Sequence, residues 1–402
     1  MKSIIYILLM VFSISVINLH AQDTQTGIYK NAAETMLNSD SKLTIGGYGQ
    51  IDFNQPLSST KFESGKLDVH RLVMLFGYRF TKKLQFITEI EFEHVKEVYI
   101  EQAFINYSFN NYINFRAGLM LVPMGIINEY HEPTTYNGVE RPIIDKYISP
   151  TTWREIGLGF SGLIPEVSMR YQAYIMNGFA SYNDGSFLLS GANGLRKARQ
   201  KGAESYINTP SLAAKVEYYG LLGMNLGVSA YAGKTQSTLY DGIDKDDNTS
   251  VAIADSSVVG VKMLGLDARY TRKGFEFRGQ FYYVWLNNSD EYNLLALSMG
   301  ESTNLGEKMM GYYAELSYNI FHEIDKFNSQ LIPFIRYSNY DTHYAVNSNI
   351  VANEAYNKTY ITAGLSWKIT SGVALKTDLQ FIKNQSQNSF EKTFNAGVAV
   401  WF

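Results

Sequence analysis

The sequence predicts an all-β protein, a transmembrane antiparallel β-barrel of about sixteen strands. Apolar and polar residues alternate with a period of two in about sixteen runs of roughly ten residues each, the repeat of a membrane barrel. The chain holds 30 Tyr and 23 Phe but 8 Pro, which favours strands and supplies aromatic belts. After the first residues, no run of about eighteen apolar residues could form a membrane-spanning helix. Strands are therefore expected to cross the membrane.

The start of the chain, residues 1–21, predicts a secretory signal peptide. Lys2 supplies a positive charge, residues 4–17 form an apolar run, and Leu19-His20-Ala21 offers a cleavage site before Gln22. The apolar run is too short to span a membrane. Without Lys2, 34 Lys and Arg face 38 Asp and Glu, a net charge of −4 that gives no reason to expect nucleic acid as a partner. The chain has no Cys, so no disulfide is expected.

Residues 22–41 are polar, with a weak helical stretch at residues 32–37. They predict a short periplasmic lead segment before the barrel, which we expect to occupy residues 42–402. Its strands are predicted at 42–54, 66–81, 83–95, 98–110, 111–121, 154–163, 166–178, 209–220, 223–236, 256–272, 273–286, 307–321, 327–341, 357–370, 371–384 and 390–402. Residues of 98–110 place Glu101 on the same face as apolar side chains, which predicts a β-bulge there.

The connections between these strands alternate in length. Tight turns such as Thr81-Lys82-Lys83 and Thr370-Ser371-Gly372 alternate with mostly longer segments. The longer segments are expected at 54–65, 122–153, 179–208, 237–255, 287–306 and 342–356. Short periplasmic turns and long extracellular loops are typical of outer-membrane barrels. About sixteen strands leave room for an aqueous channel, whereas eight strands fill the interior with side chains.

The final predicted strand carries apolar residues at 394, 396, 398, 400 and 402, with Asn395 and Gly397 between them. This amphipathic strand with a terminal aromatic residue resembles the last strand of bacterial outer-membrane β-barrels. A closing strand of a soluble β-sandwich or soluble β-barrel is the alternative.

Charged residues on the strands indicate which face is turned toward water. A charge that faces lipid at mid-membrane costs about 2–4 kcal/mol, so charged side chains should face the interior. The residues expected to line the channel are Arg71, Arg79, Glu89, Glu91, Arg116, Arg170, Arg269 and Arg278. By the same alternation, His70 falls on the opposite face with Leu72. The arginines could form a cation ladder that favours anions, or belong to a mixed lining whose ion pairs stiffen the wall.

The third long loop, residues 122–153, is rich in Pro and aromatic residues, and an ordered loop of this size is usually functional. The residues that we expect at a constriction in or beside it are Glu129, His131, Glu132, Arg141, Trp153 and Arg154. The spacing of His131 from its acidic neighbours matches no metal-binding motif, so no metal and no cofactor are expected. A basic cluster, Arg196, Lys197, Arg199 and Lys201, could attract anions, bind lipopolysaccharide or be a solvated loop.

Several motifs together resemble the phosphate-selective porin O and P family, best over about residues 43 to 180. They are Asp68-Val69-His70-Arg71-Leu72, Glu89-Ile90-Glu91-Phe92-Glu93-His94, Glu101-Gln102-Ala103, Arg116-Ala117-Gly118-Leu119, Pro123-Met124-Gly125, Asn128-Glu129-Tyr130-His131-Glu132-Pro133, Glu140-Arg141-Pro142 and Pro150-Thr151-Thr152-Trp153. The resemblance implies a homotrimer of pores in the outer membrane that pass small solutes by diffusion. It also implies a third loop folded into the barrel, and a ladder of lumen arginines with Arg71, Arg79, Arg116 and Arg170 as counterparts by face. The Ala21-Gln22 junction suggests a Bacteroidetes-type member.

The sequence favours a passive channel for small solutes, which could include phosphate and other anions, over two other functions. The acidic strand with Glu89, Glu91 and Glu93 argues against strict phosphate selectivity. An adhesin or structural barrel could bind a partner through residues 179–208 and 237–255. An outer-membrane enzyme needs a nucleophile with a His and an acid, and the sequence shows no such motif. We therefore expect a porin and not an enzyme.

Overall fold

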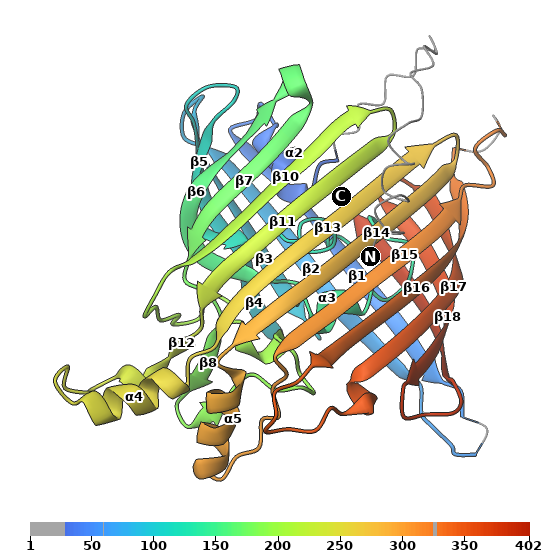
Figure 1. The fold of residues 1–402 in the computed structure, drawn as a ribbon. Coiled ribbons are helices and arrows are strands. Elements are labelled where there is room, and N and C mark those ends of the chain that lie inside the picture. The colour runs from blue at the N-terminus through green and yellow to red at the C-terminus, as the bar shows by residue number, and fades with distance from the viewer. Residues whose placement is uncertain (1–28, 59, 325–327) are drawn as a thin grey trace, which may run out of the picture.

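The computed structural model describes residues 29–58, 60–324 and 328–402. Sixteen strands form a closed barrel in which neighbours pair antiparallel, and β1 pairs with β19 to close the sheet (Figure 1). The predicted fold class is thereby confirmed. The predicted signal peptide lies outside the described residues. Within the described residues, no helix has both the length and the apolar character to cross a membrane.

The barrel strands are β1 (Leu43–Pro56), β2 (Lys66–Arg79), β3 (Leu84–Glu93), β4 (Glu97–Ser108), β5 (Asn114–Leu121), β6 (Arg154–Ile164), β7 (Met169–Met176), β10 (Ser211–Leu221), β11 (Met224–Lys234), β13 (Gly260–Arg272), β14 (Phe275–Asn287), β15 (Lys308–Tyr318), β16 (Gln330–Ala345), β17 (Asn357–Thr370), β18 (Val373–Asn384) and β19 (Glu391–Trp401). Each matches a predicted strand. The largest boundary differences are four residues, at the start of β13 and the end of β16. β13 starts later than predicted because the amide of Ser257 still bonds the carbonyl of Ala254 at the end of a helix.

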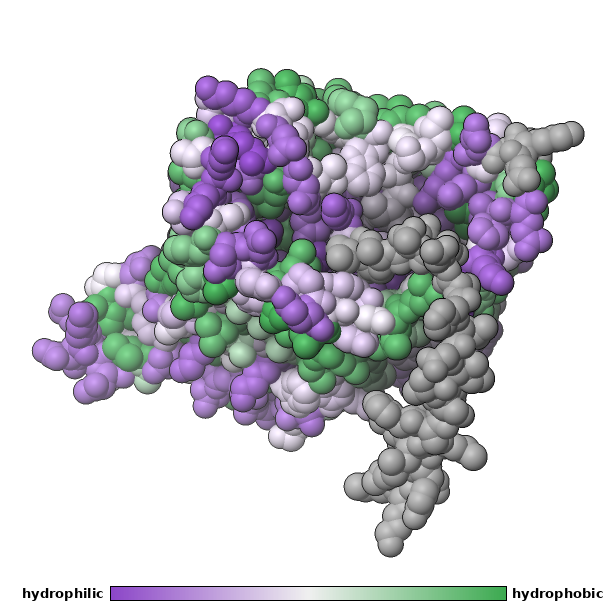
Figure 2. Space-filling view, turned by 90° about the horizontal axis from the view of Figure 1, so that it is seen from above, coloured by the Kyte–Doolittle hydropathy of each residue, from purple (hydrophilic) through white to green (hydrophobic). Residues whose placement is uncertain are grey.

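The two faces of the wall follow the alternation of the strands. In β10, Leu212, Val216 and Tyr218 are exposed on the outside, whereas Lys215 and Glu217 are each 1 % exposed on the inside. Viewed from the turn end, apolar side chains gather along the outer rim (Figure 2). The barrel is thus apolar on its lipid-facing surface and polar in its interior, the reverse of a soluble protein.

The longer connections build structure of their own at the loop end, the lower end in Figure 1. β8 (Ala180–Asn183), β9 (Ser186–Phe187) and β12 (Gln236–Ser237) form a small sheet. α4 (Asn248–Ser256) and α5 (Ser289–Ser298) project beside it, and Asp247 caps α4 by accepting from the amides of Thr249 and Ser250. Short 3₁₀ turns occupy Arg196–Ala198, Thr238–Tyr240 and Glu354–Tyr356 in these connections, and another forms the tight turn Pro165–Val167 between β6 and β7 at the opposite end. The long predicted loops are therefore largely ordered.

The described part of the predicted lead segment lies in the mouth of the barrel at the turn end. α2 (Ala32–Leu37) begins with a capping box in which Asn31 and Glu34 bond each other's backbone amides. Its buried Met36 packs toward Gly77 of β2, and its neighbours are β2 and β3. Glu34 also reaches Arg170 of β7 at 2.7 Å. The segment is thus held to the inner wall by both apolar packing and charge.

Candidate functional site

The third loop, residues 122–153, folds into the barrel and reaches its far wall. The Lys376 ammonium donates to the carbonyls of Tyr136 (2.7 Å) and Gly138 (3.0 Å), and the amide of Val139 donates to Asp378 at 2.7 Å. On another side, the Ile126 amide donates to Gln280 at 2.6 Å. α3 (Ile144–Tyr147) lies in this loop. The predicted inward fold of the third loop is confirmed, and the loop crosses the interior of the barrel.

His131 fixes the near side of this loop. Its Nε2 lies 2.9 Å from the Tyr48 hydroxyl and 3.4 Å from carboxylate oxygens of both Glu89 and Glu101. We call Tyr48, Glu89, Glu101 and His131 the loop anchor. Burial alone would lower the pKa of His131, but hydrogen bonds to Glu101 and Glu89 outweigh burial and raise it to about 10. The shift favours the protonated imidazole, which offers no lone pair to a metal ion.

The loop anchor depends on the predicted bulge in β4. The pairing of β3 with β4 shifts between Glu89 and Ile90, which leaves Glu101 as the extra residue. Glu101 is fully buried and also lies 3.9 Å from both Arg71 and Arg154. Arg71 bonds Glu91 at 3.1 Å. The predicted residues Arg71, Glu89, Glu91, His131 and Arg154 are thereby brought into one buried network.

A second network of buried charges joins the third loop to the wall at β7, β10 and β13. Lys215 lies 2.7 Å from Glu129, and Arg269 lies 3.1 Å from Glu217. Arg170 pairs with Glu217 as well as with the N-terminal segment. Three of the predicted site residues, Glu129, Arg170 and Arg269, therefore meet here. Lys215 was not singled out from the sequence, although its inward phase in strand 209–220 was available.

The remaining predicted residues lie apart from these networks. Arg79 donates to the carbonyl of Ser39, and Arg116 donates to Asn106 at 3.1 Å and faces Phe104. Arg278 pairs with Glu276 at 2.5 Å. Within the third loop, Arg141 donates to the carbonyl of His131 at 3.0 Å. Glu132 accepts from the amide of Ala32 at 2.5 Å. Trp153 is fully buried, donates to Glu155 at 2.8 Å and stacks on Phe179. In the basic cluster, Arg199 donates to the carbonyls of Pro150 and Thr152, so it supports the end of the third loop.

Two cavities flank the third loop. The outer cavity, toward the loop end, has a volume of about 350 Å³. Its charged lining residues are Arg71, Arg141, Lys146, Arg196, Arg336, Glu93, Glu140 and Asp145. His70 also lines it, because a bulge in the pairing of β2 with β1 shifts the alternation at that residue. The sequence-based placement of His70 on the outer face was therefore wrong.

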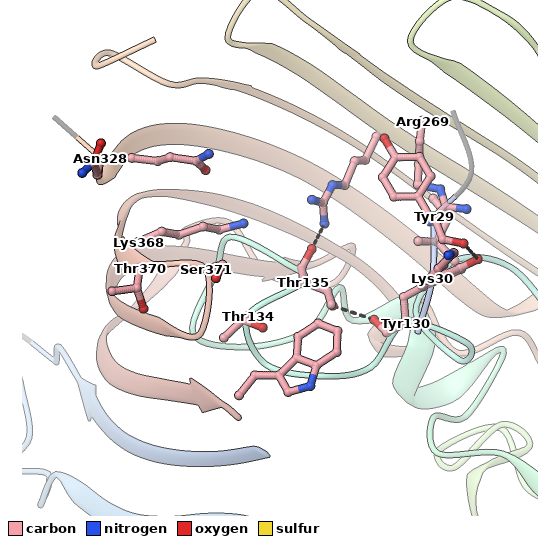
Figure 3. Close-up of a pocket in the computed structure, with 14 residues that line it drawn as sticks. Tyr29, Lys30, Tyr130, Thr134, Thr135, Arg269, Asn328, Lys368, Thr370 and Ser371 are labelled. Atoms are coloured by element: carbon pink, nitrogen blue, oxygen red, sulfur yellow. Dashed lines mark hydrogen bonds between the residues drawn. The ribbon is translucent and has the colours of Figure 1, made fainter. Parts of the chain in front are cut away.

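The inner cavity, toward the turn end, has a volume of about 430 Å³. Its charged lining residues are Lys30, Arg269, Arg278 and Lys368, and no carboxylate is among the described residues that line it. Lys368 extends from β17 into this space opposite Thr134 and Thr135 of the third loop (Figure 3). Sequence reasoning missed Lys368, although it shares the inward phase of strand 357–370 with Ser366.

The sequence profile of the family described as phosphate-selective porin O and P matches residues 43–396. The chain belongs to this porin family. An uncharacterized protein of Aquifex aeolicus is 30 % identical over 372 residues, covering 89 % of this chain and 79 % of that protein.

Two solved structures share the fold. The anion-selective porin from Comamonas acidovorans has a TM-score of 0.56 at 11 % identity, covering 90 % of this chain and 99 % of its own. OmpT of Vibrio cholerae in its trimer form has a TM-score of 0.51 at 10 % identity, covering 90 % and 100 %. The protein is a porin of the bacterial outer membrane, a channel through which small solutes diffuse passively.

Proposed function

We propose that this porin prefers anions and that small oxyanions such as phosphate are the solutes that its inner cavity fits. The observation that carries the proposal is the set of charges lining that cavity, four cations without a carboxylate among the described lining residues. Rings of Lys and Arg in a narrow aqueous passage lower the energy of an anion and raise that of a cation.

The two lysines matter most for this preference. Arg269 and Arg278 are held by Glu217 and Glu276, so much of their charge is compensated locally. Lys30 and Lys368 have no carboxylate within 4.0 Å in the described parts of the chain. An ion that crosses the inner cavity therefore meets the net field of these lysines.

Hydrogen-bond donors in the same cavity support an oxyanion over a bare halide. Thr370 and Ser371 offer hydroxyl groups, and Asn328 adds an amide to the same lining (Figure 3). Hydroxyl and amide donors can replace water molecules around a phosphate oxygen as the ion passes. Since the outer cavity carries three acidic groups as well, we propose a preference and not strict selectivity.

Block of chloride current by inorganic phosphate tests this proposal. Single channels of the purified protein in planar bilayers should carry less chloride current as phosphate is added, because phosphate dwells longer in the inner cavity. Lys368→Gln should weaken the block severalfold, whereas Lys146→Gln in the outer cavity should change it little. Phosphate that leaves the current unchanged, or a block that is equal in both variants, would refute the assignment.

We also propose that the porin assembles as a homotrimer surrounded by lipopolysaccharide at the loop end. The trimer form of Vibrio cholerae OmpT, which shares the fold, supports the assembly. Native mass spectrometry in detergent should give a mass three times that of one mature chain. A mass of one chain under conditions that preserve the barrel would contradict the trimer.

A further inference from the structure

We propose that Asp68, His70 and His94 form a binding site for a divalent transition-metal ion, with Zn²⁺ as the best match, at the loop end of the channel. We call these three residues the mouth cluster. Each offers one ligand atom, and the three atoms lie within 4.8 Å of one another. Two imidazoles and one carboxylate with room for water form a donor set that suits Zn²⁺ and its neighbours better than Ca²⁺ or Mg²⁺.

The fold brings the mouth cluster together through two local irregularities. The bulge in β2 places His70 at the outer cavity, and Asp68 pairs with the buried Asp52 of β1. His94 lies in the tight connection between β3 and β4 with a φ of 53°, and its amide contacts the carbonyl of His70 at 3.3 Å. Left-handed backbone at a non-glycine residue is uncommon and often marks a functional site. Three side chains, two from β2 and one from the turn between β3 and β4, therefore converge.

The contacts within the cluster point to a cation. The His94 Nδ1 lies 2.6 Å from the Asp68 carboxylate, yet this buried nitrogen has no hydrogen bond of acceptable geometry. The other ring nitrogen of His94, Nε2, lies 3.8 Å from Glu93. A histidine that binds a metal through one nitrogen commonly donates the other N–H to a carboxylate, and Glu93 is placed for that role.

Small side-chain rotations would complete the site. Tetrahedral Zn²⁺ holds its ligands about 2.0–2.1 Å away, which separates two ligand atoms by about 3.3 Å. The 2.6 Å contact between His94 and Asp68 would open slightly, and the 4.0 Å contact between His70 and Asp68 would close. The side chains of Asp68, His70 and His94 are 15 %, 30 % and 33 % exposed, so water can reach a fourth position.

The loop anchor shows why the mouth cluster is distinctive. Glu89, Glu101 and His131 also bring three potential ligand atoms within 4.8 Å. However, His131 is already protonated by its acidic partners, and its side chain is 2 % exposed. Arg71 and Arg154 approach Glu101 and neutralise it further. The anchor is therefore a closed structural network of buried charges, whereas the side chains of the mouth cluster are partly exposed.

Binding of Zn²⁺ can be measured directly on the folded protein. Isothermal titration of the purified porin with ZnCl₂ should give one site per chain, and Co²⁺ in its place should give the visible absorption of a low-coordinate site. The double variant His70→Ala/His94→Ala should lose this site, and Asp68→Asn should weaken it at least tenfold. The matched control His322→Ala, an exposed histidine in the turn between β15 and β16, should keep it.

The outcomes separate this inference from the proposed anion preference. Circular dichroism and the mobility of the unheated protein on gels show whether each variant keeps its barrel. If the double variant does not fold, the single variants His70→Gln and His94→Gln are tested in its place. The inference is overturned if barrels with and without the two histidines bind Zn²⁺ equally, which would show adventitious binding only, or if the native protein binds none. Zinc binding needs no ion current, so failure of the phosphate experiment would leave it intact.

Discussion

The outer and inner cavities occupy the same lumen on either side of the third loop, but their charges differ. Among described lining residues, the outer cavity has five Arg or Lys and three Glu or Asp, whereas the inner cavity has four cations and no acid. Many lumen arginines, such as Arg71 and Arg170, form ion pairs with neighbouring carboxylates that compensate their charge. We propose that selectivity depends on cations without partners and not on the number of arginines. Such a lining would combine the two alternatives that the sequence left open, a cation ladder and a wall stiffened by ion pairs.

We expect the separation of the two cavities to depend on the loop anchor, so removing the anchor should have the largest effect. His131→Ala would leave Glu89 and Glu101 buried without their cationic partner, at a cost of about 3–5 kcal/mol. We expect the loop to loosen, with a lower melting temperature, larger conductance and noisier current. His322→Ala is the control. Unchanged melting and conductance in His131→Ala would show that the anchor does not hold the loop.

Alkaline pH should weaken the same anchor without a mutation. Because the folded pKa of His131 is raised from 6.5 to about 10, its contribution is complete below about pH 6.5 and is lost as pH rises through 10. Between these two pKa values the contribution falls by about 1.4 kcal/mol for each pH unit. Melting temperature and current noise measured from pH 7 to 11 should show this change. The same titration of His131→Ala should lack it, and identical profiles would remove His131 as the cause.

Reversing one charge in the inner cavity should change ion selectivity. Lys368→Glu alters the charge by two units and breaks no ion pair in the described parts of the chain. At about 8 Å in water, this change costs a passing anion about 1 kcal/mol, or about fivefold in relative permeability. The reversal potential in a salt gradient measures the effect. A permeability ratio equal to that of the native porin would contradict the claim that the inner cavity sets ion selectivity.

The equivalent change in the outer cavity should have the smallest effect. Lys146→Glu adds an acid where Glu93, Glu140 and Asp145 already compensate cations. Burial raises the pKa of Asp145 to about 7, so this group is partly protonated at neutral pH and can take up part of the change. We expect a shift in reversal potential of less than half that of Lys368→Glu. A larger shift than in Lys368→Glu would move the selectivity site to the outer cavity.

The fold could be predicted from the sequence because the alternation of residues and the residues of the turns are local signals. The sequence predicts the strand pattern, the turn at Thr370-Ser371-Gly372 and the bulge at Glu101. Only where tertiary contacts shift the phase did the prediction fail. At His70 the bulge depends on the pairing of β1 with β2, which alternation within β2 does not reveal.

The site was harder to predict from the sequence because the ion-pair partners of its residues come from distant strands and from the third loop. The sequence named Arg71, Arg170 and Arg269 as lining residues, but their carboxylate partners are fixed only by the barrel's register and the loop's fold. Lys368 had no motif around it, and its importance arises from the absence of a nearby acid among the described residues. Charge accounting inside a barrel therefore requires its three-dimensional structure.

The reversal potential of the native porin across a tenfold KCl gradient tests the central claim most directly. The two ions have similar mobilities in water, so the sign of the potential reports the charge preference of the passage. We expect a reversal potential whose sign shows that chloride is more permeant than potassium. In Lys368→Glu this potential should move toward zero. A potential at zero or on the potassium side in the native protein would contradict the claim that unpartnered cations of the inner cavity set its selectivity.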